Sequence, residues 1–242
     1  MYQIQNFTEI ITDSAVRVDS QWQCQVIQSA ECLSYVVSNS QTSEIIVIDP
    51  KKEDEEAYLR AIKEINNGKV IYVIDTHTHA DHISCAARIS EKFSAPLVMA
   101  QSALSKKVDI RICRSTSIYT QAGSIHCLLT PGHTVDGITL FWGPFLFTGD
   151  TILYGDTGRD DLPTGDPVAH YESLVEIKKY AKSEMIFFPG HENKGGRSSS
   201  WVTQLKVNSS LTQDRQAFIV EAGSFRGKSP EHLKEALFEN LK

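Results

Sequence analysis

Residues 76–82 read Thr-His-Thr-His-Ala-Asp-His, so that three imidazoles and one carboxylate fall within six positions. The segment follows an apolar stretch that we predict to be a strand, Lys69–Ile74, and precedes a pattern of helical spacing that starts near Asp81. At this chain's own frequencies of His and Asp, such a pattern would arise by chance on the order of once in two thousand sequences. We therefore interpret the segment as metal-binding rather than as an ordinary polar loop.

Three more residues of the same chemical types each follow an apolar strand and a glycine turn. His133 comes after Pro131-Gly132, Asp150 after Thr148-Gly149, and His191 after Pro189-Gly190. Open α/β sheets place functional groups at the carboxyl ends of their strands, so we expect these side chains to join the first motif. Histidine and carboxylate donors without cysteine favour zinc, iron or manganese.

Hydrophobic periodicity predicts alternating strands and helices, which is typical of an α/β layered fold. The first half contains the expected strands Trp22–Gln28, Ser34–Ser38, Glu44–Asp49 and Lys69–Ile74, with a helix over Lys52–Asn66. The second half contains the expected strands Pro96–Ala100, Ser124–Leu129, Ile138–Trp142, Phe145–Thr148 and Met185–Phe188, a helix over Pro167–Ala181, and a last helix opened by Ser229-Pro230-Glu231. Without repeats or linkers, residues 1–242 are predicted to form a single domain with a short helical C-terminal extension.

Composition restricts the kind of partner that we expect. The formal charge of -6 argues against a nucleic-acid partner, which usually requires a basic face. The N-terminus shows no signal peptide and no apolar run long enough to span a membrane, so we expect a cytoplasmic protein with no membrane partner. No C-x-x-C spacing occurs, and we interpret all five cysteines as free thiols that fill core or loop positions: Cys24, Cys32, Cys85, Cys113 and Cys127.

Four short motifs resemble those of the metallo-β-lactamase superfamily: HTHADH at 77–82, GHT at 132–134, TGD at 148–150 and PGH at 189–191. The resemblance covers about residues 45–208 and implies a four-layer αβ/βα sandwich with a metal site at one edge. It also implies that two divalent metals, with zinc expected, flank a nucleophilic hydroxide, and that Asp81 and Asp150 act in catalysis. The implied ligands are His77, His79 and His133 for one metal, Asp81, His82 and His191 for the other, and Asp150 between them.

Two further carboxylates, Asp49 and Asp75, end strands near the motif. They either accept hydrogen bonds from ligand imidazoles or are ordinary solvated strand ends. Arg159 also has two interpretations, because its planar guanidinium suits a substrate carboxylate or phosphate and equally suits an ion pair with Asp160 or Asp161.

The stretch around Gly158-Arg159 resembles the glyoxalase II and persulfide dioxygenase group. Glyoxalase II carries a longer C-terminal domain that binds glutathione, and persulfide dioxygenases usually have Tyr where this chain has Asn193. The remaining interpretation is a metal-dependent hydrolase of a thioester, whose thiolate leaves with little acid assistance. The thioester would be a small molecule or an acyl group on a carrier protein, as in the stand-alone zinc hydrolases of bacterial polyketide antibiotic pathways.

Two alternatives stay open. One is a persulfide dioxygenase with a single Fe²⁺ on His77, His133 and Asp150. The other is a binding or regulatory protein that keeps a vestigial metal site, although every ligand position is filled here.

Overall fold

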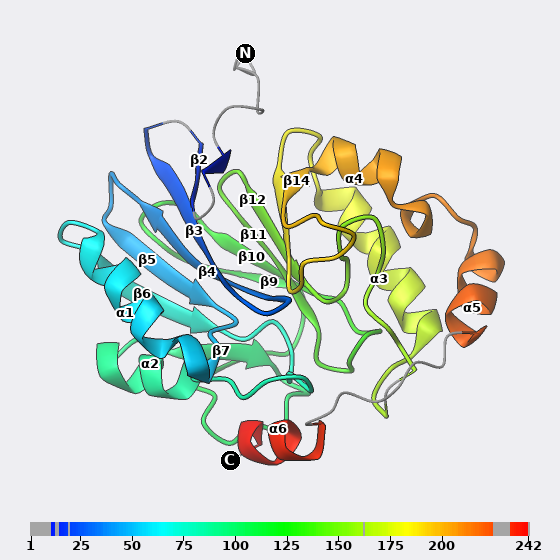
Figure 1. Ribbon diagram of the computed structural model, residues 1–242, viewed down its shortest axis with the longest axis horizontal. Coiled ribbons are helices and arrows are strands. Elements are labelled where there is room, and N and C mark those ends of the chain that lie inside the picture. Colours follow the sequence, from blue (N-terminus) through cyan, green and yellow to red (C-terminus); the bar gives the residue numbers. More distant parts are fainter. Residues whose placement is uncertain (1–10, 13–14, 19, 162, 225–232, 242) are drawn as a thin grey trace.

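Two β-sheets face each other in the computed structural model, and helices cover their outer sides (Figure 1). The structure describes residues 11–12, 15–18, 20–161, 163–224 and 233–241. Within them, a long connection that contains a helix joins three of the four pairs of parallel neighbours, as is usual for parallel pairing.

The first sheet has eight strands that lie in chain order. Strands β1 to β5 pair antiparallel, and β5 to β8 pair parallel, with α1 and α2 in the connections β5–β6 and β6–β7. The elements are β1 (Ile11–Thr12), β2 (Ala15–Val18), β3 (Trp22–Ser29), β4 (Cys32–Asn39), β5 (Glu44–Ile48), the 3-10 helix η2 (Lys52–Asp54), α1 (Glu55–Glu64), β6 (Lys69–Ile74), α2 (Ala86–Phe93), β7 (Leu97–Ala100) and β8 (Ile110–Ile112).

The second sheet has six strands in the order β14-β13-β12-β11-β10-β9. Only β12 and β13 among them run parallel, and α3 lies in the connection between these two. The elements are β9 (Thr116–Ile118), β10 (Ile125–Leu129), β11 (Ile138–Trp142), β12 (Phe145–Gly149), α3 (Pro167–Tyr180), β13 (Ile186–Pro189), β14 (Ser199–Ser200), α4 (Trp201–Val207), the 3-10 helix η3 (Ser209–Leu211), α5 (Arg215–Ser224) and α6 (Leu233–Asn240).

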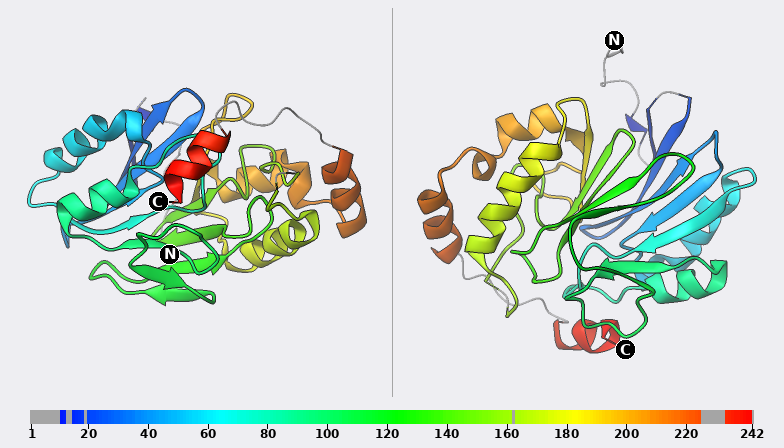
Figure 2. Two further views of the ribbon diagram at one scale, coloured as in Figure 1. Left: turned by 90° about the horizontal axis from the view of Figure 1, so that it is seen from below. Right: turned by 180° about the vertical axis from the view of Figure 1, so that it is seen from behind.

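Three apolar clusters separate the layers. One fills the space between the sheets and includes Ile48 and Phe147, a second lies under α1 and α2, and a third lies under α3, α4 and α5. Both faces of the central strands are therefore buried, which explains why β5 and β12 are apolar along their length instead of alternating. Figure 2 shows the helices on the outer sides of the two sheets, and the predicted four-layer α/β sandwich is confirmed.

One predicted helix boundary is wrong. The helix expected to start near Asp81 begins only at Ala86, and the preceding segment has no regular structure. The physical reason is that this segment is hydrogen-bonded to the side chain of Asn240. The backbone N–H of Ser84 donates to Asn240 Oδ1, and Asn240 Nδ2 donates to the carbonyl oxygen of His82. The expected start of the last helix, 229–231, lies outside the described residues.

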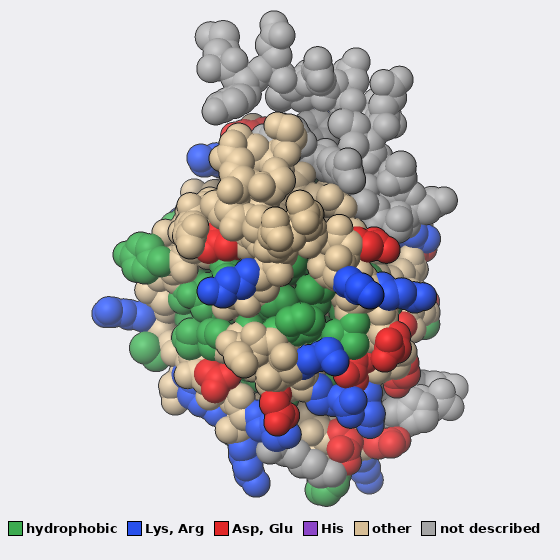
Figure 3. Space-filling model, turned by 90° about the vertical axis from the view of Figure 1, so that its left-hand side faces the viewer, with side chains coloured by type: hydrophobic (Ala, Val, Ile, Leu, Met, Phe, Trp, Pro, Cys, Tyr) green, Lys and Arg blue, Asp and Glu red, His purple; other side chains and the backbone are tan. Residues whose placement is uncertain are grey.

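The side of the molecule at the left of Figure 1 carries a band of hydrophobic side chains (Figure 3). Lys and Arg side chains alternate with Asp and Glu around this band, in keeping with a chain whose acidic residues only modestly outnumber its basic ones. None of the described helices is both long enough and apolar enough to cross a lipid bilayer.

An aromatic contact between the neighbouring strands β12 and β13 makes a testable contribution to stability. Phe147 is fully buried and stacks on Phe188 with ring centroids 5.2 Å apart. We expect Phe147→Ala to lower the free energy of unfolding by about 3–5 kcal/mol, because the lost ring leaves a cavity. Urea denaturation measures this change, and Val220→Ala on the exposed side of α5 is the control, with an expected effect within about 0.5 kcal/mol. Equal effects of the two substitutions would contradict this assignment of the core.

Candidate metal centre

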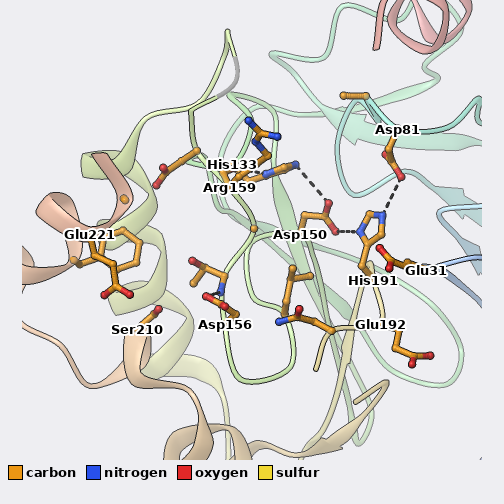
Figure 4. Close-up of a pocket in the computed structure, with 18 residues that line it drawn as sticks. Glu31, Asp81, His133, Asp150, Asp156, Arg159, His191, Glu192, Ser210 and Glu221 are labelled. Carbon is orange, nitrogen blue, oxygen red and sulfur yellow. Dashed lines mark hydrogen bonds and ion pairs between the residues drawn. The ribbon is translucent and has the colours of Figure 1, made fainter. Parts of the chain in front are cut away.

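The predicted ligands come from strand ends of both sheets. Strands β10 and β12 each run antiparallel to β11, and β13 runs parallel to β12, so the three strands end at the same edge. His133, Asp150 and His191 follow these ends, and the 77–82 motif follows β6 of the facing sheet. All seven predicted ligand residues lie together there, and Figure 4 shows Asp81, His133, Asp150 and His191 pointing toward one another.

His77, His133 and Asp150 form the first group of donors, with one donor atom from each lying within 4.8 Å of the others. The Nδ1–H of His133 donates to the carbonyl oxygen of Arg159 at 2.5 Å, since that oxygen can only accept. This bond leaves the lone pair of His133 on Nε2, which faces Asp150 Oδ2 at 3.5 Å. A backbone contact thus orients one ligand and selects its tautomer, as is usual around metal sites.

His79 lies beside the two carboxylates whose role the sequence leaves open. Its Nε2 lies 3.3 Å from Asp49 Oδ1 and 3.9 Å from Asp75 Oδ1, and both carboxylates are buried. Asp49 also accepts hydrogen bonds from the backbone N–H and the hydroxyl of Thr76, at 2.6 and 2.8 Å. The alternative of solvated strand ends is therefore wrong, because both carboxylates are buried: Asp49 accepts from Thr76, and Asp75 accepts from the hydroxyl of Ser84 at 2.8 Å.

Asp81, His82 and His191 form the second group. Asp81 Oδ2 accepts from His82 Nδ1 at 3.1 Å and from His191 Nε2 at 2.9 Å. His191 Nδ1 lies 2.8 Å from Asp150 Oδ1, so this ring connects the two acidic side chains. Gly190 makes the approach possible, because a Cβ on it would lie 2.3 Å from Asp150 Oδ1.

Burial and neighbouring charges set the protonation states of the site. Burial alone would raise the pKa values of Asp150 and Asp81, but the surrounding histidines hold both well below the usual range. Burial lowers the pKa of His77 to about 4, which keeps this imidazole neutral. Burial would also lower the pKa of His82, but its hydrogen bond to Asp81 raises it to about 10. Two carboxylates therefore stay ionised among imidazoles, as a cation site requires.

Four ring nitrogens of the predicted ligands are buried and have no hydrogen-bond partner among the described residues: His77 Nε2, His79 Nδ1, His79 Nε2 and His82 Nε2. A buried polar atom that is left unpaired costs about 1–3 kcal/mol, so such atoms in one cluster point to a missing partner. His77 belongs to the first group and His82 to the second, and the ionised Asp150 of the first group contacts His191 of the second at 2.8 Å. The residues present fit divalent metal ions on both sides of Asp150.

Arg159 is paired within its own loop. Its Nε and Nη2 lie 2.6 and 2.8 Å from the two carboxylate oxygens of Asp161, which agrees with the ion-pair interpretation. Its backbone oxygen, as described above, orients His133. Gly158 lets this loop reach the site, because its N–H donates to the carbonyl oxygen of Asp150 at 2.9 Å and a Cβ on it would lie 2.1 Å from that oxygen.

Two residues that the sequence motifs do not include, Asp136 and Asn240, support the 77–82 segment. Asp136 accepts from the backbone N–H of Thr78 at 2.9 Å and from its hydroxyl at 2.5 Å. Asn240, near the end of the chain, donates from Nδ2 to the carbonyl oxygens of His79 and His82 at 3.0 and 2.8 Å. Asp136 lies three positions after His133 and is a weak local signal, whereas nothing local marks Asn240.

A cavity of about 670 Å³ opens beside the ligands (Figure 4). Asp81, His133, Asp150 and His191 line its inner part. The rest of its wall includes the acidic side chains Glu31, Asp156, Asp160, Glu192 and Glu221, and one basic side chain, that of Arg159. A small molecule, or the end of a long flexible group attached to a carrier, can therefore reach the predicted ligands through this cavity.

The sequence model described as the metallo-beta-lactamase superfamily matches residues 30–110 and 122–191, which is more than half of the chain. The chain belongs to the metallo-β-lactamase superfamily. The matched residues of this superfamily member include all seven predicted ligands and end at His191. The suspected resemblance is confirmed at the level of the family.

Individual relatives carry the names of two different activities. The human mitochondrial persulfide dioxygenase ETHE1 is 24% identical over 221 residues, which cover 90% of this chain and 87% of the relative. The hydroxyacylglutathione hydrolase of Idiomarina loihiensis is 24% identical over 188 residues, covering 78% and 68%. The crystal structure of ETHE1 from Myxococcus xanthus superposes with a TM-score of 0.83 at 25% identity, covering 90% of this chain and 97% of that one.

Asp49 provides a first test of the metal centre in this superfamily member. We expect Asp49→Asn to weaken metal binding by about 10–100-fold, because the amide cannot replace the charged carboxylate beside His79 and Thr76. Isothermal titration of the metal-free protein with Zn²⁺ measures this change. Glu56→Gln, the same chemical change on the exposed side of α1, is the control and should leave the affinity unchanged. An unchanged affinity in Asp49→Asn would show that this carboxylate does not support the site.

Asn240 provides a second test, at a residue far from the ligands in sequence. We expect Asn240→Asp to weaken zinc binding, because it removes the Nδ2 donor and sets a carboxylate against the carbonyl oxygens of His79 and His82. Hydrogen exchange of residues 77–85 should become faster in the metal-free variant, and Lys234→Gln on the exposed side of α6 should change neither quantity. Unchanged exchange in Asn240→Asp would remove this residue from the support of the motif.

Proposed function

We propose that this protein is a metal-dependent hydrolase that cleaves a thioester. The observation that carries the proposal is the set of unpartnered buried nitrogens on both groups of donors, with Asp150 between them. Such an arrangement suits two divalent metals, with zinc as the expected ion, better than it suits one. The similarity to a hydroxyacylglutathione hydrolase supports this reaction class.

Bound divalent metals would supply an activated water and would polarise the substrate carbonyl. Neighbouring groups of the chain set the positions and charges of the predicted donors. His133 is fixed by the carbonyl oxygen of Arg159, His79 lies beside the carboxylate of Asp49, and Asp150 keeps its charge although it is buried. The departing thiolate is a good leaving group, so the absence of an evident general acid beside the donors, among the described residues, fits a thioester better than an amide.

The charge of the cavity favours a thiol arm that carries no net charge near the metals. Acidic side chains outnumber basic ones in its wall, where Asp156 is paired with Lys194, Glu192 with Arg197, and the one basic side chain, Arg159, with Asp161. Like charges in a cleft oppose the binding of an anionic ligand. A pantetheine arm, which is uncharged along its length and can carry an acyl group on a carrier protein, therefore fits better than glutathione with its two carboxylates.

A second candidate is oxygen-dependent chemistry on a persulfide at one iron. The observation in its favour is that His77, His133 and Asp150 form a compact group of donors by themselves, without residues of the second group. The relatives named persulfide dioxygenase add support, since one of them aligns over 90% of this chain. The two reactions differ in their use of oxygen, because hydrolysis consumes none.

Parallel assays separate the two candidates. We expect zinc-loaded protein to release free thiol from acyl-pantetheine, detected with a chromogenic disulfide, and iron-loaded protein to consume no oxygen with glutathione persulfide. Asp150→Ala should reduce thiol release to the level of the metal-free protein, because the charged link between the donor groups is lost. Glu56→Gln is the control and should retain full activity.

Oxygen consumption without thiol release would replace the hydrolase by the dioxygenase. No turnover in either assay, with both metals bound, would contradict both enzymatic assignments. Faster cleavage of S-lactoylglutathione than of acyl-pantetheine would keep the reaction class and overturn the proposed substrate.

A further inference from the structure

Cys32 lies among the second group of donors, although its sequence position suggested a filler. It is the first residue of β4, and its backbone bridges to that of His191. The bridge consists of two hydrogen bonds, one from the N–H of Leu33 to the carbonyl oxygen of Gly190 and one from the N–H of Glu192 to that of Glu31, both at 2.8 Å. Two contacts of the main chain therefore fix the thiol beside the turn that carries His191.

The distances around the sulfur match those between donors of one metal ion. Cys32 Sγ lies 3.2 Å from Asp81 Oδ2 and 3.6 Å from His191 Nε2. Donor atoms of Cys32, Asp81 and His82 all lie within 4.8 Å of one another. A tetrahedral zinc ion with ordinary bond lengths places a sulfur and a nitrogen donor about 3.5 Å apart. The thiol is thus located where a ligand of the second site would be.

A second observation is independent of the cysteine. His82 is 6% exposed, and its Nε2 has no hydrogen-bond partner among the described residues. This unpartnered nitrogen points to a missing metal ion in the second group whether or not Cys32 is counted as a donor. The other cysteines have different surroundings. Cys24 and Cys127 lie in the apolar cluster between the sheets, the Cys85 thiol donates to the carbonyl oxygen of Lys51, and Cys113 is exposed.

We propose that Cys32 Sγ is a protein ligand of the second metal site, together with Asp81, His82 and His191. The proposal rests on the metal centre of the proposed function and not on its reaction. A thiolate ligand favours zinc, cobalt or cadmium over manganese or magnesium at this site, and its proton leaves to solvent on binding. With Cys32, the second group offers four protein donors besides the carboxylate of Asp150.

Cobalt binding tests the ligand directly, because thiolate bound to Co²⁺ gives a sulfur-to-cobalt charge-transfer band in the near ultraviolet. We expect the metal-free full chain to bind two cobalt ions and to develop this band in the course of the titration. In Cys32→Ser the band should vanish, and one of the two ions should bind at least about tenfold more weakly. Cys113→Ser, the same change at an exposed thiol, should retain both the band and the affinities.

Far-ultraviolet circular dichroism of metal-free Cys32→Ser checks that the variant folds. If it does not fold, alkylation of the wild-type chain followed by peptide mass spectrometry decides, since bound zinc should slow the modification of Cys32 and leave that of Cys113 unchanged. Two bound cobalt ions without the band, a band that persists in Cys32→Ser, or binding of a single cobalt would overturn the proposal. Thioester hydrolysis without the band would contradict the ligand alone, and the band without hydrolysis would contradict the function alone.

Discussion

The carboxylate of Asp150 connects the two groups of donors. One oxygen lies 2.8 Å from His191 Nδ1, and the other lies 3.5 Å from His133 Nε2 and 3.9 Å from His77 Nε2. Burial opposes its negative charge, and only the surrounding imidazoles or metal ions compensate for that cost. Because these histidines come from both sheets, the sandwich must close correctly before the carboxylate is stabilised. The fold and the site therefore depend on each other.

Side chains from distant parts of the chain hold the 77–82 motif in a segment without regular structure. Asp49 binds it from the end of β5, Asp136 from the turn after His133, and Asn240 from α6. Each supplies a hydrogen-bond partner that a helix would otherwise provide within itself. This explains why α2 begins only after the last predicted ligand of the motif, and Asn240 connects the C-terminal helix to the same segment.

The sequence predicts the parts of the fold that depend on local pattern. Strands such as β5, β6 and β12 are continuous apolar runs, and the residues that follow β10, β12 and β13 lie at one edge because parallel ends must meet there. The short strands β8, β9 and β14 have two or three residues and leave too little pattern to detect. Cys32 and Asn240 reach the site through contacts of high sequence separation, which no local pattern encodes. The sequence leaves Arg159 with two interpretations, a contact with a substrate anion or an ion pair with Asp160 or Asp161. Only the structure shows its bidentate pair with Asp161.

The central claim is that metal ions lie on both sides of Asp150. Anomalous diffraction from a crystal of the zinc-loaded protein, recorded on both sides of the zinc absorption edge, tests this claim most directly. The account predicts two peaks, one among His77, His79 and His133 and one among Asp81, His82 and His191, with the Asp150 carboxylate between them. A single peak among His77, His133 and Asp150, with the other donors still bonded to one another, would contradict it.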